Sequence, residues 1–387
     1  MSHHNILFQQ VKHQISRHVF ESVEKRFFGP NEVRKFGNKC LFLFWAYAHI
    51  TNSVSMRSVV ESLNHYRDRL YHLGFKSISL STISDAISKR TYKFFKELFF
   101  IELADCKRSF RRMIDFPVKI LDATEISFRH KKMKWNELKH STNCLKVHVL
   151  LSGLSNFLLD VKVTSGKIGD ITWAKTLNFA RGTILLMDRA YFNSVWWRKL
   201  NRDGVIMISR LRKDLVYHII SRRQFKRPET KGKITYIISE ERIQMMGEST
   251  KELDVHLRAI TLYDEQKQEE FKIVTNDFKM RNESIAQLYK SRWQVELFFK
   301  WIKQNLKIKK FISYNSNGIQ MQIWTALLVY MLLWRMRQQS AKYMKFQMLP
   351  FLRYIKDRLM IRDVNIHFGK SPPQSRIRQI QLFEEKN

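Results

Sequence analysis

Four polar side chains share one face of an otherwise apolar stretch, residues 286–306, whose sequence is AQLYKSRWQVELFFKWIKQNL. They are Tyr289, Arg292, Glu296 and Lys303. If the stretch forms one helix, a rotation of about 100° per residue places all four within roughly 60° of arc. Apolar residues cover most of the remaining circumference, which predicts a buried helix. A buried carboxylate between cations needs a partner such as a metal ion, because burying an unpaired charge is costly.

Two further carboxylates follow predicted strands: Asp122 in VKILDATE and Asp188 in ILLMDRAYF. An ordinary ion pair explains either aspartate alone, and Arg189 offers one to Asp188. Together with Glu296, the two aspartates form a set of hard oxygen ligands, which favours Mg²⁺ or Mn²⁺ over zinc. Two such ions can activate an attacking water or 3′-hydroxyl and stabilise the leaving oxygen of a phosphodiester. The set therefore predicts phosphoryl transfer on nucleic acid, with Asp122, Asp188 and Glu296 as catalytic residues and metal ligands.

The other members of the polar face fit a nucleic-acid substrate. Arg292 and Lys303 can hold backbone phosphates beside the metal ions, and Tyr289 can donate a hydrogen bond to the same phosphate. Trp293 and Trp301 border this face, and either can stack on an unpaired base. Core packing is the alternative for both tryptophans, and it suits Trp301 better than Trp293. The alternative for the two cations is pairing with Glu296 within the helix, which stabilises an exposed helix by only about 0.2–0.5 kcal/mol.

Charge points to the same class of partner. The chain has 69 Lys and Arg against 35 Asp and Glu, a net charge of +34, which favours a polyanion and predicts salt-sensitive binding. The longest apolar run, residues 323–334, is shorter than the roughly 20 residues that cross a bilayer, so we expect no membrane segment. The N-terminus lacks a signal architecture, which predicts a cytoplasmic protein. Cys40, Cys106 and Cys144 are too scattered to indicate a disulfide framework or a structural zinc site.

Hydrophobic periodicity predicts an α/β protein with a helical N-terminal domain. Residues 1–114 read as helices, and residues 56–64 and 79–90 fit either a helix-turn-helix or an ordinary helical hairpin. The first alternative would place Ser81, Thr82, Ser84 and Lys89 near DNA. Three consecutive strands and then alternating strands and helices predict a mixed sheet. The expected domains are a helical DNA-binding domain at 1–114, a catalytic domain at 115–205 and 277–340, a β-rich insertion at 206–276 and a basic, extended tail at 341–387.

The spacing of Tyr289, Arg292, Glu296 and Lys303 in YKSRWQVELFFKWIK resembles the Tyr-Arg-Glu-Lys signature of the DDE transposases of the insertion-sequence-four family. ILDATEISF is similar to the family's first aspartate block and MDRAYFN to its second. The segment LKIKKFISYNSNGIQMQIWTALLVY resembles the one that follows the signature, and FQQVKHQISRHVFESVEKRF and SMRSVVESL resemble the helical leader of one bacterial branch. The resemblance runs over most of the chain.

This resemblance implies an RNase H-like catalytic domain with a β insertion before the helix that carries the glutamate. It also implies cut-and-paste transposition of double-stranded DNA between terminal inverted repeats and a target, through a homodimeric synapse. Asp122, Asp188 and Glu296 would be the metal ligands, and Tyr289, Arg292, Lys303 and Trp293 would contact DNA, with no small-molecule cofactor. Ala123 stands where relatives often have Ser or Thr, which leaves Glu125 as a competing acidic group. Lys300 lies on the same arc without an assigned role.

Two alternatives stay open from the sequence. A decayed copy would bind element ends or repress transcription without cutting DNA. An RNase H-like nuclease would cleave DNA without joining it.

Overall fold

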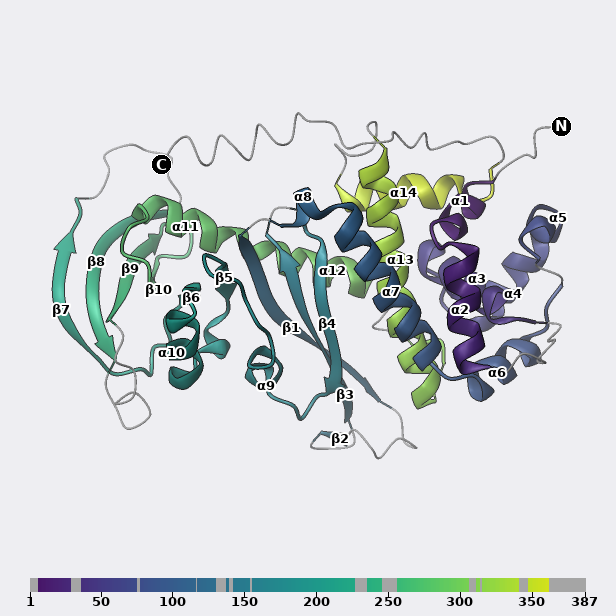
Figure 1. The fold of residues 1–387 in the computed structure, drawn as a ribbon, viewed down its shortest axis with the longest axis horizontal. Coiled ribbons are helices and arrows are strands. Elements are labelled where there is room, and N and C mark those ends of the chain that lie inside the picture. Colours follow the sequence, from purple (N-terminus) through teal and green to yellow (C-terminus); the bar gives the residue numbers. More distant parts are fainter. Residues whose placement is uncertain are drawn as a thin grey trace. The chain divides into compact units, whose positions relative to one another are not determined.

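The computed structural model describes residues 6–28, 36–74, 77–115, 117–129, 137–138, 142–153, 155–226, 235–245, 256–305, 311–313, 315–340 and 347–361 (Figure 1). The chain divides into two compact units. One contains Met1–Ser109 together with Lys300–Asn387, and the other contains Phe110–Phe299. We describe each unit by itself.

The first unit is helical, as the sequence predicts for residues 1–114. Ser16, Ser55 and Ser79 cap three of its helices by accepting a backbone N–H three residues later, which satisfies a donor that the first helical turn leaves free. Its described helices are α1 (Leu7–His13), α2 (Arg17–Phe27), α3 (Asn38–Thr51), α4 (Met56–His65), α5 (Arg67–Leu70), the 3-10 helix η1 (Tyr71–Leu73), α6 (Leu80–Lys89), α7 (Lys93–Ser109), α13 (Ser316–Gln339) and α14 (Met348–Arg358).

Two nearly apolar helices, α3 and α13, form the core of the helical unit. Their side chains are buried around almost the whole circumference, so neighbouring helices must cover them. α13 packs on α7 and α3, which places it in the helical unit, whereas we assigned residues 277–340 to the catalytic domain. The compact units thus differ from the predicted domain boundaries, which stay predictions of functional regions.

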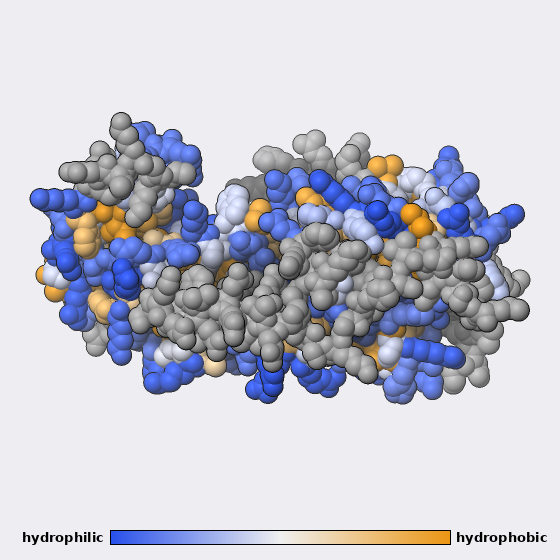
Figure 2. Space-filling view, turned by 90° about the horizontal axis from the view of Figure 1, so that it is seen from above, coloured by the Kyte–Doolittle hydropathy of each residue, from blue (hydrophilic) through white to orange (hydrophobic). Residues whose placement is uncertain are grey.

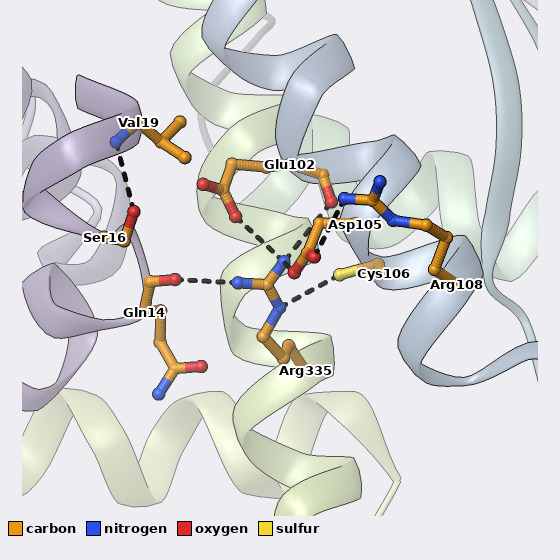
Figure 3. A network of polar contacts seen from close by, with 8 residues as sticks. All are labelled: Gln14, Ser16, Val19, Glu102, Asp105, Cys106, Arg108 and Arg335. Atoms are coloured by element: carbon orange, nitrogen blue, oxygen red, sulfur yellow. Dashed lines mark hydrogen bonds and ion pairs between the residues drawn. The ribbon is translucent and has the colours of Figure 1, made fainter. Parts of the chain in front are cut away.

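A buried ionic network joins α13 to α7 and to the end of α1 (Figure 3). The Arg335 guanidinium contacts the Glu102 carboxylate at 2.8 Å and the Asp105 carboxylate at 3.2 Å. It also donates to the Gln14 carbonyl oxygen at 2.7 Å and to the Cys106 sulfur at 3.0 Å. Only 7% of the Arg335 side chain and 4% of the Glu102 side chain are exposed. Breaking such a pair would leave an uncompensated buried charge.

The connection between α4 and α6 is longer than a helix-turn-helix permits. Residues 66–79 include α5 and η1, whereas that motif joins its two helices by a turn of about 3–4 residues. This geometry favours the alternative of a helical hairpin within the bundle. Ser81, Ser84 and Lys89 are exposed on α6, and Lys89 pairs with Asp85 at 2.9 Å.

The second unit is built on one mixed sheet. The three consecutive strands that the sequence predicts are β1 (Val118–Arg129), β3 (Thr142–Ser152) and β4 (Leu158–Ser165). They are antiparallel neighbours, and the short β2 (Glu137–Leu138) pairs with one end of β3. On the other side of β1, β5 (Ile184–Met187) and β6 (Ile206–Arg210) are parallel to it. The order β4-β3-β1-β5-β6, with three antiparallel strands followed by two parallel ones, is that of an RNase H-like sheet.

The predicted β-rich insertion continues this sheet. β10 (Glu269–Thr275) pairs with β6, and β9 (His256–Asp264), β8 (Thr235–Met245) and β7 (Tyr217–Gln224) follow in order toward the edge. Residues 206–210, which we placed in the insertion, form the parallel strand β6 of the central sheet. The sequence did not indicate β7, because this edge strand is exposed along almost its whole length and lacks the alternation of a half-buried strand.

Short helices connect the strands of this unit. They are α8 (Arg111–Ile114), α9 (Asp170–Ala174), the 3-10 helix η2 (Arg189–Tyr191), α10 (Ser194–Arg202) and α11 (Asn282–Ser291), and α12 (Trp293–Asn305) begins in it. The single helix that we expected over residues 286–306 is wrong in two respects. It is interrupted at Arg292, where the backbone N–H bonds to the carbonyl of Tyr289 only three residues earlier. It is also not buried all round, because Trp293 is 57% exposed and Leu297 is 43% exposed.

The predicted extended tail contains a helix. In α14, Phe351, Leu352 and Ile355 are buried on one face, a spacing that the sequence analysis overlooked among the basic residues. The basic end of the tail, residues 362–387, lies outside the described residues. Within the described part of the chain, no helix has the length and apolar character that crossing a membrane requires. Hydrophilic residues predominate on the face drawn in Figure 2, with smaller apolar patches between them.

Candidate active site

Asp122 lies within β1 and not after it, as we had expected; β3 pairs with it on one side, and the pairing with β5 on the other side ends one residue earlier. The strand pairs with β3 along its length, and with β5 up to Leu121. The Asp122 Oδ1 atom accepts the backbone N–H of Ala123 at 2.8 Å, and 18% of the side chain is exposed. The pKa of Asp122 is raised to about 6, mainly by burial and in smaller part by the carboxylates of Asp188 and Glu296, against the opposing effects of the Ala123 N–H and Arg292. The three predicted carboxylates therefore interact electrostatically.

Asp188 is brought next to Asp122 by parallel pairing. Leu121 is the register partner of Met187, so the following residues of both strands, Asp122 and Asp188, lie at the same end of the β1–β5 pair. The Asp188 Oδ1 atom accepts the backbone N–H of Arg189 at 2.7 Å, where Asp188 caps η2. The alternative of an ion pair with the Arg189 side chain is not formed among the residues that the structure describes. Strand ends of this kind place carboxylates at the edge of an α/β sheet.

Glu296 reaches the site from α12 through a shared arginine. The Arg292 Nη1 atom lies 3.3 Å from Asp122 Oδ2, and its Nη2 atom lies 2.6 Å from Glu296 Oε1. The Arg292 and Glu296 side chains are 15% and 34% exposed. The pairing within the helix that we considered as an alternative is thus present, and Arg292 also bridges to Asp122 on β1. The Asn156 side chain, in the connection between β3 and β4, donates a hydrogen bond to the Gln294 side chain at 3.1 Å and so links α12 to this connection.

The remaining predicted site residues occupy different environments. Tyr289 is half-buried, its ring lies 5.8 Å from the Arg292 guanidinium carbon, and burial together with Asp188 raises the pKa of its hydroxyl. Trp293 is exposed beside Arg292. Lys303 is half-buried on α12, two turns after Glu296, and Lys300 is exposed between them.

Trp301 belongs to the core. It is 7% exposed and its ring packs edge-on against Tyr330 with centroids 5.0 Å apart. The preference for core packing at Trp301 is therefore confirmed.

Tyr191 is a neighbour of the site that sequence reasoning missed. It is 1% exposed on η2, within the second aspartate block MDRAYFN. Burial raises the pKa of its hydroxyl strongly, and the carboxylates of Asp122, Asp170 and Asp188 raise it further. Tyr191 therefore stays protonated between three acids. Its only signal in the sequence is its place in MDRAYFN.

Glu125 does not join the three carboxylates. Alternation along β1 places it on the opposite face from Asp122, and its side chain lies 3.5 Å from the Lys146 ammonium. Lys146 also pairs with Asp170 at 3.1 Å, and His148 lies beside Asp170 with its Nδ1 atom 3.7 Å away. Burial lowers the pKa of His148 to about 4, so this histidine is neutral at physiological pH. Glu125, the acidic group that could have competed for the site, is therefore engaged in an ion-pair cluster separate from the three carboxylates.

The donor set suits a hard divalent cation. All three side chains offer carboxylate oxygens, the type of ligand that Mg²⁺ and Mn²⁺ prefer. Mutual repulsion contributes to the raised pKa of Asp122, and a bound cation would relieve it. Among the described residues, no three His, Cys, Asp or Glu side chains are already gathered tightly enough to hold a metal ion, and Arg292 stands between Asp122 and Glu296.

The order of the strands places the protein in the RNase H-like class, and the carboxylates of Asp122 on β1, Asp188 directly after β5 and Glu296 on α12 are the ones expected for an Asp-Asp-Glu site. A family model described as a transposase DDE domain matches residues 115–332, a range that includes every predicted site residue. The chain belongs to this family and is a DNA transposase, and the family depends on divalent metal ions. A second model, described as a domain of unknown function, matches residues 3–76.

Sequence relatives agree with this class. A protein named as a transposase from Sinorhizobium fredii is 26% identical over 70% of this chain and 74% of its own length. Two further relatives are named as transposases for insertion sequence elements. The one from Geobacillus stearothermophilus is 23% identical over 76% of this chain and 77% of its own length. The one from Synechocystis is 27% identical over 73% of this chain and 76% of its own length. A piggyBac transposase, solved as a synaptic complex with hairpin DNA, matches at 9% identity with a TM-score of 0.37 and covers 95% of this chain and 86% of that one.

Proposed function

We propose that this protein moves an insertion sequence by cut-and-paste transposition, cleaving the DNA strands at the terminal inverted repeats and joining the freed 3′ ends to a target. The supporting observation is that the parallel β1–β5 register brings Asp122 and Asp188 to the same end of the strand pair and that Arg292 links Asp122 to Glu296. Sequence relatives named as insertion sequence transposases give the proposal its biological setting.

Asp122, Asp188 and Glu296 would hold the divalent cations, which we propose to be two Mg²⁺ or Mn²⁺ ions. When bound, such ions supply an activated water or 3′-hydroxyl and stabilise the leaving oxygen of a phosphodiester. The β1–β5 pair fixes the two aspartates relative to each other, because four consecutive register pairs precede them. The sheet does not fix the third carboxylate in the same way, since Glu296 comes from a helix that begins after the interruption at Arg292.

The cations and aromatic residues of the helical segment would contact DNA. Arg292 and Lys303 would bind backbone phosphates, and Tyr289 would donate its protonated hydroxyl to the same backbone. Trp293 is exposed and so is available to stack on an unpaired base at a strand end. The net charge of +34 supplies a long-range attraction for DNA.

Pairing two element ends requires two active sites, so we propose a homodimer in the synaptic complex. We also propose that the protein acts in the bacterial cytoplasm, at the nucleoid. The named relatives come from bacteria, which is in keeping with this setting.

An excision assay tests the proposal. A plasmid carrying the gene with its flanking inverted repeats is incubated with the protein and Mg²⁺, and excised element and strand-transfer products are expected. Pre-cut element ends are then supplied with target DNA to isolate the joining step. Cleavage without joining would favour a nuclease. Binding of the ends without cleavage would favour a decayed DNA-binding protein, which the family match does not support.

A further inference from the structure

Arg292 forms the only bridge that the described residues make between β1 and the carboxylate of α12. One guanidinium nitrogen contacts Asp122 at 3.3 Å and the other contacts Glu296 at 2.6 Å. Just 15% of the Arg292 side chain is exposed, so solvent screens these contacts less than it screens surface pairs. The positive charge lies between two of the three carboxylates that are proposed to bind cations.

A guanidinium and divalent cations compete for the same oxygens. Arginine stays charged at all accessible pH values, and so removing it from carboxylates requires another anion to receive it. A backbone phosphate is such an anion, because the guanidinium fork matches phosphate as well as carboxylate. The Arg292 Nε atom is buried without a hydrogen-bond partner in the structure, so the present arrangement leaves one donor of the fork unused.

Arg292 also lies at the interruption between two helices. It is the residue between α11 and α12: its backbone N–H donates to the Tyr289 carbonyl, and its own carbonyl accepts the N–H of Val295, so both bonds span three residues. The Tyr289 ring, 5.8 Å from the guanidinium carbon, provides an aromatic surface beside it.

We propose that Arg292 is an exchangeable counter-ion, which binds Asp122 and Glu296 until a DNA phosphate takes it and frees both carboxylates for divalent cations. The inference rests on the proposed function, because it assumes the metal ligands named there. It couples DNA binding to metal binding, and by linkage each ligand must strengthen the other by the same factor. An active site of this kind binds cations tightly only when DNA is present.

Mn²⁺ binding to the full-length protein, followed by electron paramagnetic resonance without DNA, tests the exchange. Arg292→Ala should bind Mn²⁺ about fivefold or more tightly than the wild type, since typical coupling between sites is about 5–150-fold. Lys300→Ala is the matched control. It removes one positive charge from an exposed position one helical turn after Glu296, and we expect a change of less than about twofold because solvent and salt screen that charge.

The sign of the effect separates this role from others. Unchanged or weaker Mn²⁺ binding by Arg292→Ala would overturn the inference, since a residue that only contacts DNA leaves the affinity unchanged. Thermal unfolding confirms that each variant is folded. If Arg292→Ala does not fold, Arg292→Lys replaces it. A lysine keeps the charge without the fork, so tighter binding than the wild type is again expected, and equal binding would contradict the exchange.

A duplex carrying the element's inverted repeat provides the second arm. It should tighten Mn²⁺ binding more in the wild type than in Arg292→Ala, and equal tightening would overturn the exchange. Asp122→Asn distinguishes the two proposals. If Asp122→Asn leaves Mn²⁺ binding intact, the metal site of the proposed function fails. If Arg292→Ala tightens binding as expected but the wild type does not excise DNA, the counter-ion role stands and the transposition proposal fails.

Discussion

The raised pKa of Asp122 predicts that replacing this carboxylate, which we propose to be catalytic, stabilises the protein. In the folded state the pKa of Asp122 is about 6, against an ordinary value of 3.8, so the folded chain holds this proton to higher pH than the unfolded chain does. Ionising Asp122 therefore costs folding free energy. The cost is absent below pH 3.8, grows between pH 3.8 and 6, and is constant above pH 6.

The size of the effect follows from the two pKa values. At 1.36 kcal/mol per pKa unit, the interval between 3.8 and about 6 corresponds to about 3 kcal/mol at pH 7.5. Asp122→Asn removes the charge and should raise the free energy of unfolding by up to that amount. For a unit the size of residues 110–299, this is a rise in Tm of about 6–12 °C. At pH 4 the gain should fall below about 1 kcal/mol.

Thermal unfolding at pH 7.5 and pH 4 in EDTA measures this gain. Asp160→Asn is the control, because the Asp160 Oδ1 atom also accepts the next backbone N–H at 2.8 Å but lies on β4, two strands from β1. We expect a gain at pH 7.5 for Asp122→Asn that the control lacks. A Tm that falls at pH 7.5, or rises equally at both pH values, would refute the account of Asp122 as a desolvated carboxylate beside two others.

Three further outcomes are expected. Arg335→Met should lower the free energy of unfolding of the helical unit by about 3–5 kcal/mol, measured by urea unfolding, because it leaves the buried Glu102 carboxylate without its partner. Arg17→Met, which breaks an exposed ion pair, is the control and should have no measurable effect. Trp293→Ala should weaken binding of unpaired DNA ends by about 1–3 kcal/mol in fluorescence titrations without changing Tm. Trp301→Ala should instead destabilise the fold by about 3–5 kcal/mol, and equal effects of the two tryptophans would contradict their assignment.

The sequence alone singled out the two aspartates, because an apolar strand can be recognised from a few neighbouring residues. Asp188 directly follows the apolar strand β5, whereas Asp122, which we expected after a strand, lies within β1; the parallel register still brings both to the same end of the β1–β5 pair. Helical spacing predicted the polar face of residues 286–306 on one continuous helix, but Tyr289 lies on α11 and Glu296 and Lys303 lie on α12. The order of the strands and the RNase H-like fold came from the resemblance and were not deducible from periodicity.

The contacts of Arg292 could not be predicted, because they depend on where α12 lies against β1. Spacing along a helix shows the pair with Glu296, but the contact with Asp122 joins residues that are 170 positions apart. The interruption at Arg292 was also invisible, since no Gly or Pro marks it. Strand β7 and helix α14 were missed for a related reason: exposure and basic residues obscured their patterns.

The most direct test of the central claim is DNA nicking at the element ends by the wild type and three variants. Asp122→Asn, Asp188→Asn and Glu296→Gln each keep the size of the side chain while removing its charge. We expect each to abolish Mg²⁺-dependent nicking while binding of the same DNA, measured by gel shift, is retained. Nicking that persists in all three variants would contradict the assignment of these carboxylates as the catalytic site.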